Sequence, residues 1–309
     1  MSAAAGIDSE TAPAGAAPGI WRRLARNGAV RFGGAVLLVL LVLALAAPWL
    51  GTVDPTLFDP ASRDLLPGRA GEVMTLDGNV LQHTFWMGSD SYGRDIYSRV
   101  LYAARVSLLV GATVALLALA FGTLAGMLAG YFRWLDGVLM RVMDGLMAVP
   151  SILLAIALVA MWQASLWTVI AAITVPEIPR VTRLVRSLVL GMRAEPYVEA
   201  AVSVGTSRFG ILTRHILPNC IAPLAVQGTY VCASAMLVEA ILSFLGVGLP
   251  TDIPTWGNMM AEGRLEFTQY PQNVLFPGVF LALTVFAVNI LGDGLRDTLD
   301  PRFGKRGER

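Results

Sequence analysis

Long apolar stretches separated by short polar segments restrict the fold of this 309-residue chain more than any other feature. Hydrophobic residues make up 55% of the chain and charged residues only 15%, whereas about 25% of residues are charged in an ordinary soluble domain. So few charged residues cannot cover a soluble globule of this size. About 20 apolar residues are enough for one helix to cross a bilayer. The sequence therefore predicts an all-α, polytopic integral membrane protein.

The apolar stretches predict six transmembrane helices. Pro150 lies inside the third of them, and Pro176 and Pro179 interrupt the fourth, because a proline ring removes a backbone hydrogen bond and frees a carbonyl. The polar segment 51–95 between the first two helices is expected to be a loop with a little local structure around 73–81. The expected spans are residues 32–50, 96–130, 144–161, 166–185, 221–247 and 274–291.

The first apolar stretch follows several arginines, a pattern that fits either a signal peptide or an uncleaved membrane anchor. The stretch has about 18 residues, which is long for the apolar part of a signal peptide, and further spans follow. We therefore interpret it as an uncleaved first transmembrane helix with its N-terminus inside the cell.

The distribution of basic residues orients the spans. Seventeen of the 23 Lys and Arg residues lie inside if the N-terminus, segment 131–141, segment 179–218 and the C-terminus face the cytoplasm, as the positive-inside rule requires. Both termini are then cytoplasmic. The expected layout is a cytoplasmic, partly disordered tail (1–31), the first helix (32–50), an external loop (51–95), a core domain with five helices and a cytoplasmic loop at 190–218 (96–295), and a cytoplasmic tail (296–309).

The cytoplasmic stretch Glu195–Pro218 has the punctuation of two short helices joined by a turn. Pro196 suits the first position of a helix, and Gly205 suits the left-handed residue that follows a helix end. Thr206 or Ser207 can cap the second helix, and Pro218 is expected to end it.

Glu199, Ala200 and Ala201 lie in the first of these two short helices. Small side chains let another protein approach the helix closely, so the stretch is interpreted as a docking element for a cytoplasmic partner. An ordinary amphipathic loop between two membrane helices explains the same residues. The residues alone leave both interpretations open.

Small residues recur at every fourth position in the second span. Gly122, Gly126 and Gly130, with Ala118 before them, form a ridge that lets membrane helices pack backbone to backbone. The ridge predicts a tight helix contact, either within this chain or with a second subunit.

Three acids, Asp144, Glu177 and Glu239, are expected in or near the bilayer, where ionisable groups are costly and often functional. Asp144 is expected at the cytoplasmic boundary, paired with Arg141 or Arg133. Glu239 and the nearby Ser243 are candidates for lining a translocation path, although Glu239 can equally form hydrogen bonds between helices.

The sequence indicates no cofactor or metal bound by this chain. The histidines His83 and His215 are the only two, and no cluster has metal-ligand spacing. Cys220 and Cys232 lie twelve residues apart in one apolar segment, about 18 Å along a helix, which is beyond disulfide reach. The net charge of +1 says nothing about partners, and no nucleic-acid partner is expected.

The motifs together resemble a known family. Glu199-Ala-Ala201, Gly205 and Leu217-Pro218 are similar to the cytoplasmic EAA loop in permease subunits of bacterial ABC importers. The family has an apolar residue, usually Ile, two positions before Leu-Pro, where this chain has His215. Over about residues 30–302 the chain resembles the C-type permease of dipeptide, oligopeptide and nickel importers, on the segments 88–99, 104–111, 242–248, 254–258 and 291–301.

The resemblance implies the type I ABC importer permease fold and a set of partners. These are a homologous B-type permease, forming a heterodimer, two ATPase subunits, identical or different, a periplasmic or lipid-anchored substrate-binding protein, and membrane lipid. It implies that Glu199, Ala200, Ala201, Gly205, Leu217 and Pro218 couple the permease to an ATPase. The partners would bind ATP and Mg, and this chain has no GxxxxGK[ST] phosphate loop.

The resemblance thus implies a non-catalytic subunit that imports dipeptides or short oligopeptides across the bacterial cytoplasmic (inner) membrane by alternating access. Glutathione, nickel chelates and other small solutes remain alternatives. An ion-coupled secondary transporter would need ion sites in broken helices, for which the stretch around Glu177 is the one candidate. An intramembrane hydrolase would need a base beside a nucleophile, and Ser151 has no His or Lys at membrane depth.

Overall fold

The computed structural model describes residues 20–74, 78–163 and 165–299. Its helices and strands are α1 (Ile20–Arg26), α2 (Gly28–Ala46), η1 (Ala47–Trp49), η2 (Pro60–Ser62), β1 (Arg69–Met74), β2 (Val80–Phe85), α3 (Ile96–Tyr131), α4 (Arg133–Ala148), α5 (Ser151–Met161), α6 (Leu166–Met192), α7 (Pro196–Ser203), α8 (Arg208–Gly210), η3 (Ile211–Ile216), α9 (Leu217–Phe244), α10 (Trp256–Gly263), η4 (Arg264–Glu266) and α11 (Gln272–Leu299).

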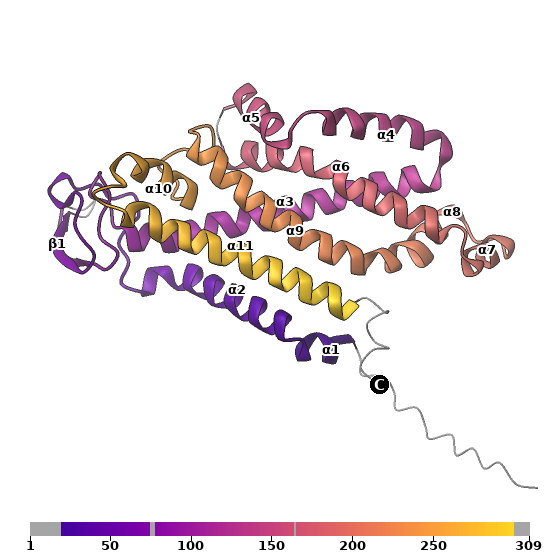
Figure 1. Cartoon of the computed structure of the whole chain (residues 1–309), viewed down its shortest axis with the longest axis horizontal. Coiled ribbons are helices and arrows are strands. Elements are labelled where there is room, and N and C mark those ends of the chain that lie inside the picture. The colour runs from indigo at the N-terminus through magenta and orange to yellow at the C-terminus, as the bar shows by residue number, and fades with distance from the viewer. Residues whose placement is uncertain (1–19, 75–77, 164, 300–309) are drawn as a thin grey trace, which may run out of the picture.

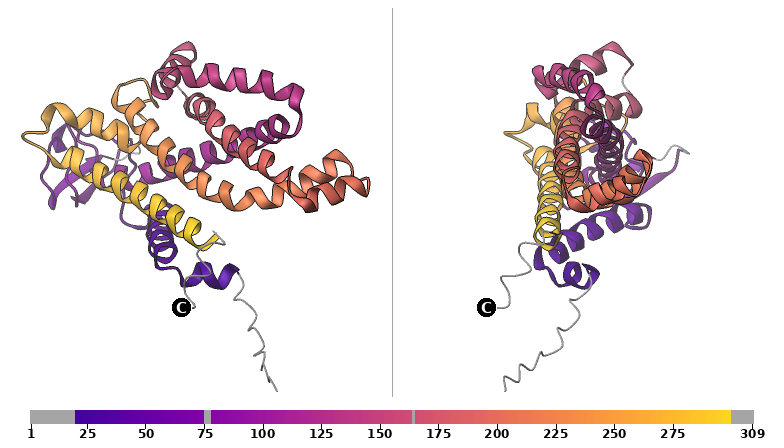
Figure 2. Two further views of the ribbon diagram at one scale, coloured as in Figure 1. Left: turned by 45° about the vertical axis from the view of Figure 1, so that its right-hand side comes forward. Right: turned by 90° about the vertical axis from the view of Figure 1, so that its right-hand side faces the viewer.

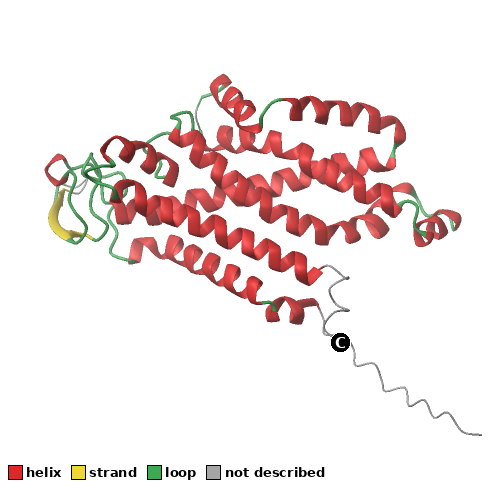
Figure 3. Ribbon diagram, in the orientation of Figure 1, coloured by secondary structure: helices red, strands yellow, loops and turns green. Residues whose placement is uncertain are grey.

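The long helices lie side by side along the long axis of the molecule (Figure 1). The strands and α10 gather at one end, which we call the hairpin end, and α7 and α8 project from the other, which we call the tip end (Figures 1 and 3). In the described residues the buried apolar side chains form two clusters. One joins α3, α6 and α9 through residues such as Val110, Ile173 and Val231. The other joins α10 to α3 and α9 through Ile96, Met236 and Trp256.

The segment between the first two long helices contains an antiparallel hairpin, more extensive than the local structure expected around 73–81. Strand β1 pairs with β2 from Arg69 opposite Phe85 to Met74 opposite Val80. Phe85 is fully buried. It lies beside Gly71, where an added Cβ would be 3.0 Å from its ring. Val73 and Phe85 are thus the buried apolar positions of the hairpin, and Phe85 covers Gly71 on the neighbouring strand.

The number of membrane spans differs from the six expected. Among the described residues, four helices are long and apolar enough to cross a membrane: Gly28–Trp49, Ile96–Tyr131, Arg208–Phe244 and Gln272–Leu299. The bent pair α4 and α5 makes a fifth if it counts as one span. Helix α6, which carries Glu177, Arg180, Arg183 and Arg186, is not in this set. With 27 residues, α6 is long enough to cross a membrane, and it packs inside the bundle. Its charged residues therefore explain why it is not among these four helices.

Segment 131–141, expected to separate two spans on the cytoplasmic side, is helical over most of its length. Phe132 alone separates α3 from α4, and α4 is a regular helix from residue 133. The chain turns instead at Val149 and Pro150, where α4 and α5 meet at 90°. Val149 is extended, as expected before a proline because the ring excludes the helical conformation of the preceding residue.

The expected interruption at Pro176 and Pro179 was wrong, because α6 is continuous through both prolines. Both prolines are buried inside the bundle. In a membrane the freed carbonyls are tolerated where neighbouring protein covers them, and α6 packs against α3, α5 and α9 around this point.

The glycine ridge of α3 lies against α6 within this chain. A Cβ added at Gly122 would lie 2.5 Å from the Cβ of Val181, and one added at Gly130 would lie 2.6 Å from that of Val189. At Gly126 the added atom would meet the backbone oxygen of Thr182 at 2.7 Å. The two backbones are therefore too close for any side chain on the ridge.

We expect Gly126→Val to destabilise the folded protein by about 1–3 kcal/mol, since the added side chain must push α3 away from α6. The matched control is Gly34→Val in α2, where an added Cβ has nothing within 4 Å. Thermal unfolding in detergent measures both. Equal midpoints for the two variants would show that the close contact does not limit stability.

Candidate functional site

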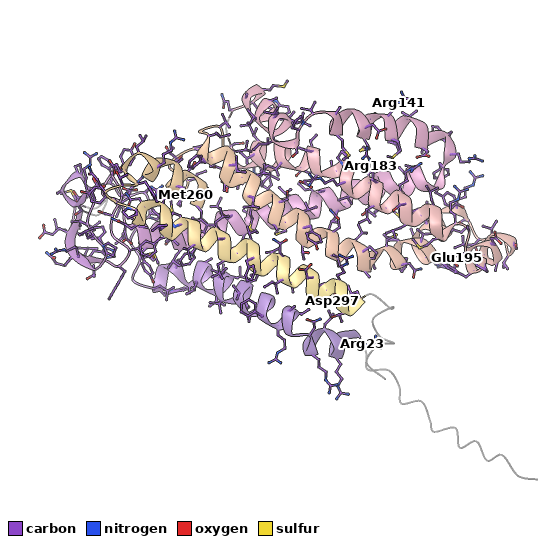
Figure 4. The ribbon with its side chains drawn as sticks, in the orientation of Figure 1. Arg23, Arg141, Arg183, Glu195, Met260 and Asp297 are labelled. Atoms are coloured by element: carbon purple, nitrogen blue, oxygen red, sulfur yellow. The ribbon has the colours of Figure 1, made fainter. Side chains whose placement is uncertain are left out.

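The candidate site is the tip, residues 195–210, which carries α7 and α8 beyond the ends of the long helices (Figures 1 and 2). Glu195, labelled in Figure 4, marks where α6 gives way to this segment. The tip connects α6 to α9, two helices that contact each other in the bundle.

Local sequence accounts for the shape of the tip. Pro196 occupies the first turn of α7, where its missing N–H costs nothing. Gly205 follows the helix with a φ of 84°, a conformation that favours glycine. The Ser207 hydroxyl accepts a hydrogen bond from the Gly210 amide at 3.2 Å and caps α8. The tip therefore has two short helices and a turn between them.

One face of α7 is anchored and the other is open. Val198 is only 2% exposed and holds α7 to the rest of the chain, whereas Glu199 and Ala200 are exposed and Ala201 is partly exposed. Val204 and Phe209 are 86% and 75% exposed, and Tyr197 and Val202 are also exposed. Large apolar side chains gathered at a protruding end are typical of a surface that binds another protein.

Pro218 was expected to end the second short helix, but the helix continues through it. Helix α8 continues through the wide π turn η3 into α9, so that one helical rod runs from Arg208 to Phe244. The Leu217 amide donates to the Leu212 carbonyl, five residues back. This wider spacing leaves Pro218 in the first turn of α9, where a proline is accepted. Leu217 and Pro218 thus join the tip to a membrane helix.

The residue that departs from the family pattern, His215, contacts α7. The rings of His215 and Tyr197 have centroids 6.4 Å apart. The next residue, Ile216, is fully buried. The apolar anchor at this level is therefore supplied by Ile216, and the histidine helps to hold α7 against η3.

Arginines of α6 fix the base of the tip end. Arg186 donates twice to the Asp136 carboxylate of α4, at 2.5 and 2.7 Å, and the Arg193 guanidinium donates to the carbonyls of Gly130 and Tyr131 at 3.1 Å. Asp144 pairs with Arg183 at 2.6 Å, not with Arg141 or Arg133 as expected. Asp144 pairs with α6 rather than within its own helix because α4 lies along α6 in the folded bundle (Figure 4).

Glu239 and Ser243, the candidates for a translocation path, are both buried, and the Ser243 hydroxyl donates to Glu239 at 2.8 Å. They lie on α9 beneath α10, since a Cβ added at Gly257 would be 2.8 Å from the Ser243 Cβ. Both are thus enclosed between helices of this chain. Their role in a translocation path stays a prediction.

The hairpin end contains a buried ion cluster that the sequence did not indicate. Arg94 contacts Asp90 at 2.7 Å and Glu262 of α10 at 2.6 Å. Arg99, only 1% exposed, contacts the same Glu262 at 3.2 Å. Burial raises the pKa of the Glu262 carboxyl, and the two arginines oppose that shift. Only a structure could join these partners, because Glu262 is 163 residues from Arg99.

In the described part of the chain no three His, Cys, Asp or Glu side chains are grouped so that they could hold a metal ion. Cys220 and Cys232 both lie on α9 as free thiols.

The fold is that of a helical membrane protein with an exposed, partly apolar tip at one end. The fold is similar to that of a chain in the inward-facing MetNI methionine ABC transporter, with a TM-score of 0.55 and 16% identity, over 65% of this chain and 96% of that one. Residues 97–305 match the family described as binding-protein-dependent transport system inner membrane component. The chain belongs to this family.

Residues 19–67 match a second family, the N-terminal transmembrane domain of oligopeptide transport permease C. The chain is 49% identical to a probable peptide ABC transporter permease of Sinorhizobium fredii, over 91% of each chain. It is 39% identical to the dipeptide transport permease DppC of Alkalihalophilus pseudofirmus, over 91% of this chain and 88% of that one. It is also 39% identical to the glutathione transport permease GsiD of Escherichia coli, over 91% and 89%.

We expect Glu262→Gln to destabilise the protein by about 1–3 kcal/mol, because the buried Arg99 loses its nearest partner and keeps only Asp90, at 3.8 Å, among the described ion pairs. The matched control is Glu72→Gln on the hairpin, where the exposed carboxylate accepts a hydrogen bond from the Gln82 amide at 2.8 Å. This change is expected to be within about 0.5 kcal/mol. Thermal unfolding of the purified protein measures both. A Glu262→Gln variant as stable as the control would show that the cluster does not hold the hairpin end.

Proposed function

We propose that this chain is the permease subunit of an ATP-driven importer that moves dipeptides or short oligopeptides into the cell, and that its tip couples transport to ATP hydrolysis. The observation that carries the proposal is the exposed face of α7, with Glu199 and Ala200 beside an apolar surface, on a rigid connection to α9. Family membership supports the transport role.

The tip is proposed to face the cytoplasm. The basic residues support this orientation, since Arg133, Arg186, Arg193 and Arg208 all lie toward the tip end of their helices. With this orientation the hairpin and α10 face outward. Both chain ends are proposed to be cytoplasmic, because α1 and the end of α11, labelled at Arg23 and Asp297 in Figure 4, lie toward the tip end.

The geometry of the tip supports a mechanical role for it. A partner ATPase that binds α7 moves the N-terminal part of α9 directly, because α8, η3 and α9 form one helical rod. Helix α6, which leads into the tip from the other side, is held to α4 by ion pairs. Closure of an ATPase pair would therefore rotate helices as a body rather than bend a loop, which is the requirement for alternating access.

The partners of this mechanism are proposed as follows. A homologous B-type permease completes the membrane dimer, two ATPase subunits bind and hydrolyse ATP with Mg, and a periplasmic or lipid-anchored binding protein delivers the solute. This chain is then the non-catalytic subunit in the bacterial cytoplasmic membrane. We propose residues 96–295 as the core permease domain, which is supported by the family match over 97–305.

Peptides are the proposed substrate because relatives that share 39–49% of their residues with this chain carry the names of peptide and dipeptide permeases. Glutathione, itself a small peptide, is the second candidate, on the 39% identity to a glutathione permease. Uptake of labelled dialanine in competition with glutathione separates the two.

Charge reversal at the tip tests coupling. In proteoliposomes containing the full complex, we expect Glu199→Arg to lower ATP-driven uptake at least about tenfold, because a wrong charge at a buried contact costs several kcal/mol. ATP hydrolysis stimulated by the binding protein falls with it. The control is Asp297→Arg. Asp297 is also an exposed acid at the tip end of the molecule, but it lies on α11, outside the tip itself. Normal uptake by an assembled Glu199→Arg complex would contradict the coupling role.

A further inference from the structure

A polar strip follows the open face of α6 and α9 at membrane depth. On α6, Glu177 is buried and its carboxylate contacts the Arg180 guanidinium at 3.4 Å. On α9, the Ser234 hydroxyl donates to the same carboxylate at 3.1 Å. Tyr230, one turn from Ser234 toward the tip, donates through its hydroxyl to Asp293 of α11 at 3.0 Å. We call these residues the polar strip.

Glu177 and Ser234 of the strip lie well inside the bilayer. Glu177 is eleven residues from the start of α6 at Leu166, and Ser234 is ten residues from the end of α9 at Phe244. At 1.5 Å per residue both lie about 15–17 Å from the hairpin end of the helices, near the middle of a hydrocarbon core of about 30 Å. Arg180 lies about 21 Å from the same end.

Arg180 cannot face lipid at this depth. Its side chain is 50% exposed in the chain alone, and an arginine at the membrane centre is costly unless water or protein covers it. The side chain contacts Glu177, one turn toward the membrane centre, rather than reaching for the nearer cytoplasmic boundary. The open face at Arg180 must therefore meet water or another polar group in the working transporter.

A cavity of about 680 Å³ adjoins the strip on the side that faces the tip. It lies between α6, α9 and α11, and its lining includes Leu184, Gln227, Tyr230 and Arg296. Leu184 is one turn from Arg180, and Tyr230 belongs to the strip itself. The volume is in the range of small-molecule sites, which combine apolar walls with a few polar groups. A cavity of this size has room for a short peptide.

The charges of the strip and the cavity select the ligand. Arg180 has five N–H donors, and among the described residues Glu177 is its one carboxylate partner. Arg296 adds a second guanidinium at the cavity, where it lies one turn after the Asp293 carboxylate of the strip on α11. Gln227 and Tyr230 supply groups that match peptide amides. A short peptide with a free carboxylate fits this set, with apolar side chains against Leu184 and the neighbouring prolines.

We propose that the polar strip and the adjoining cavity form the inner half of the translocation path, and that Arg180 binds the C-terminal carboxylate of a short peptide in transit. The proposal rests on the peptide importer and the orientation proposed above, and it assigns a specificity-determining residue to that importer. The Glu177 carboxylate positions the guanidinium, and Ser234 holds the carboxylate between α6 and α9.

The test uses cysteine accessibility in the full complex in proteoliposomes without nucleotide. Both native cysteines are replaced by alanine, Gln227→Cys places a thiol in the cavity, and a membrane-impermeant maleimide is applied from the tip side. We expect labelling of Gln227→Cys, and protection by millimolar dialanine. Leu116→Cys, an exposed apolar position on α3, is the control and is expected to stay unlabelled.

Two further arms test the carboxylate. Alanyl-alaninamide lacks the C-terminal charge, and we expect it to protect at least about tenfold less well than dialanine, because a charge-assisted hydrogen bond is lost. Arg180→Gln is expected to reduce protection by dialanine to the level of the amide, while labelling of Gln227→Cys continues. The amide arm needs no change at Arg180 and is independent of any effect of the variant on folding.

Each other outcome overturns the inference. An unlabelled Gln227→Cys would show that a second permease or lipid covers this face. Labelling without protection would show water but no peptide site. Equal protection by dialanine and its amide, or protection unchanged in Arg180→Gln, would remove the carboxylate role. ATP-driven uptake of dialanine by the same complex is measured separately, so a failure here is distinguishable from a failure of the importer proposal.

Discussion

The close approach of α3 and α6 is the contact on which the rest of the structure depends. Lipid gives apolar helices no reason to associate, so membrane helices rely on close packing and polar contacts. Gly122, Gly126 and Gly130 let the two backbones meet without intervening side chains. Helix α6 is thereby fixed in the middle of the bundle, where it also contacts α4, α5 and α9. Both the tip and the polar strip are attached to this one helix.

A fixed α6 and a continuous α9 give the tip its mechanical character. The arginines of α6 hold α4 through Asp136 and Asp144, while α9 extends without a break into the tip. A force on α7 is therefore passed to α9, which is continuous with the tip, while α6 stays held to α4. The wide turn at η3 is the one place where the rod departs from regular α geometry, and it accommodates Pro218 at that point without ending the helix.

Features set by neighbouring residues could be predicted from the sequence, and features set by distant partners could not. Pro196, Gly205 and Ser207 shape the tip through their own backbone preferences, so the two short helices followed from local rules. Pro218 does not end the helix, because the preceding π turn places it in the first turn of α9, where a proline is accepted. The partner of Asp144 and the cluster around Glu262 depend on helices that meet only in the folded bundle. The six expected spans were likewise drawn from local apolarity, which does not reveal the 90° bend between α4 and α5.

The three buried or boundary acids show why burial alone does not identify a transport residue. Glu239 is enclosed between α9 and α10, and its carboxylate accepts from Ser243 of its own helix. Glu177 is equally buried, yet its carboxylate holds a guanidinium that remains half exposed. A solute can reach only the second arrangement without separating packed helices. An arginine that faces lipid without water or polar partners is too costly. We therefore propose that a polar solute crosses the inner half of the bundle at the open face of Arg180 rather than at the enclosed Glu239.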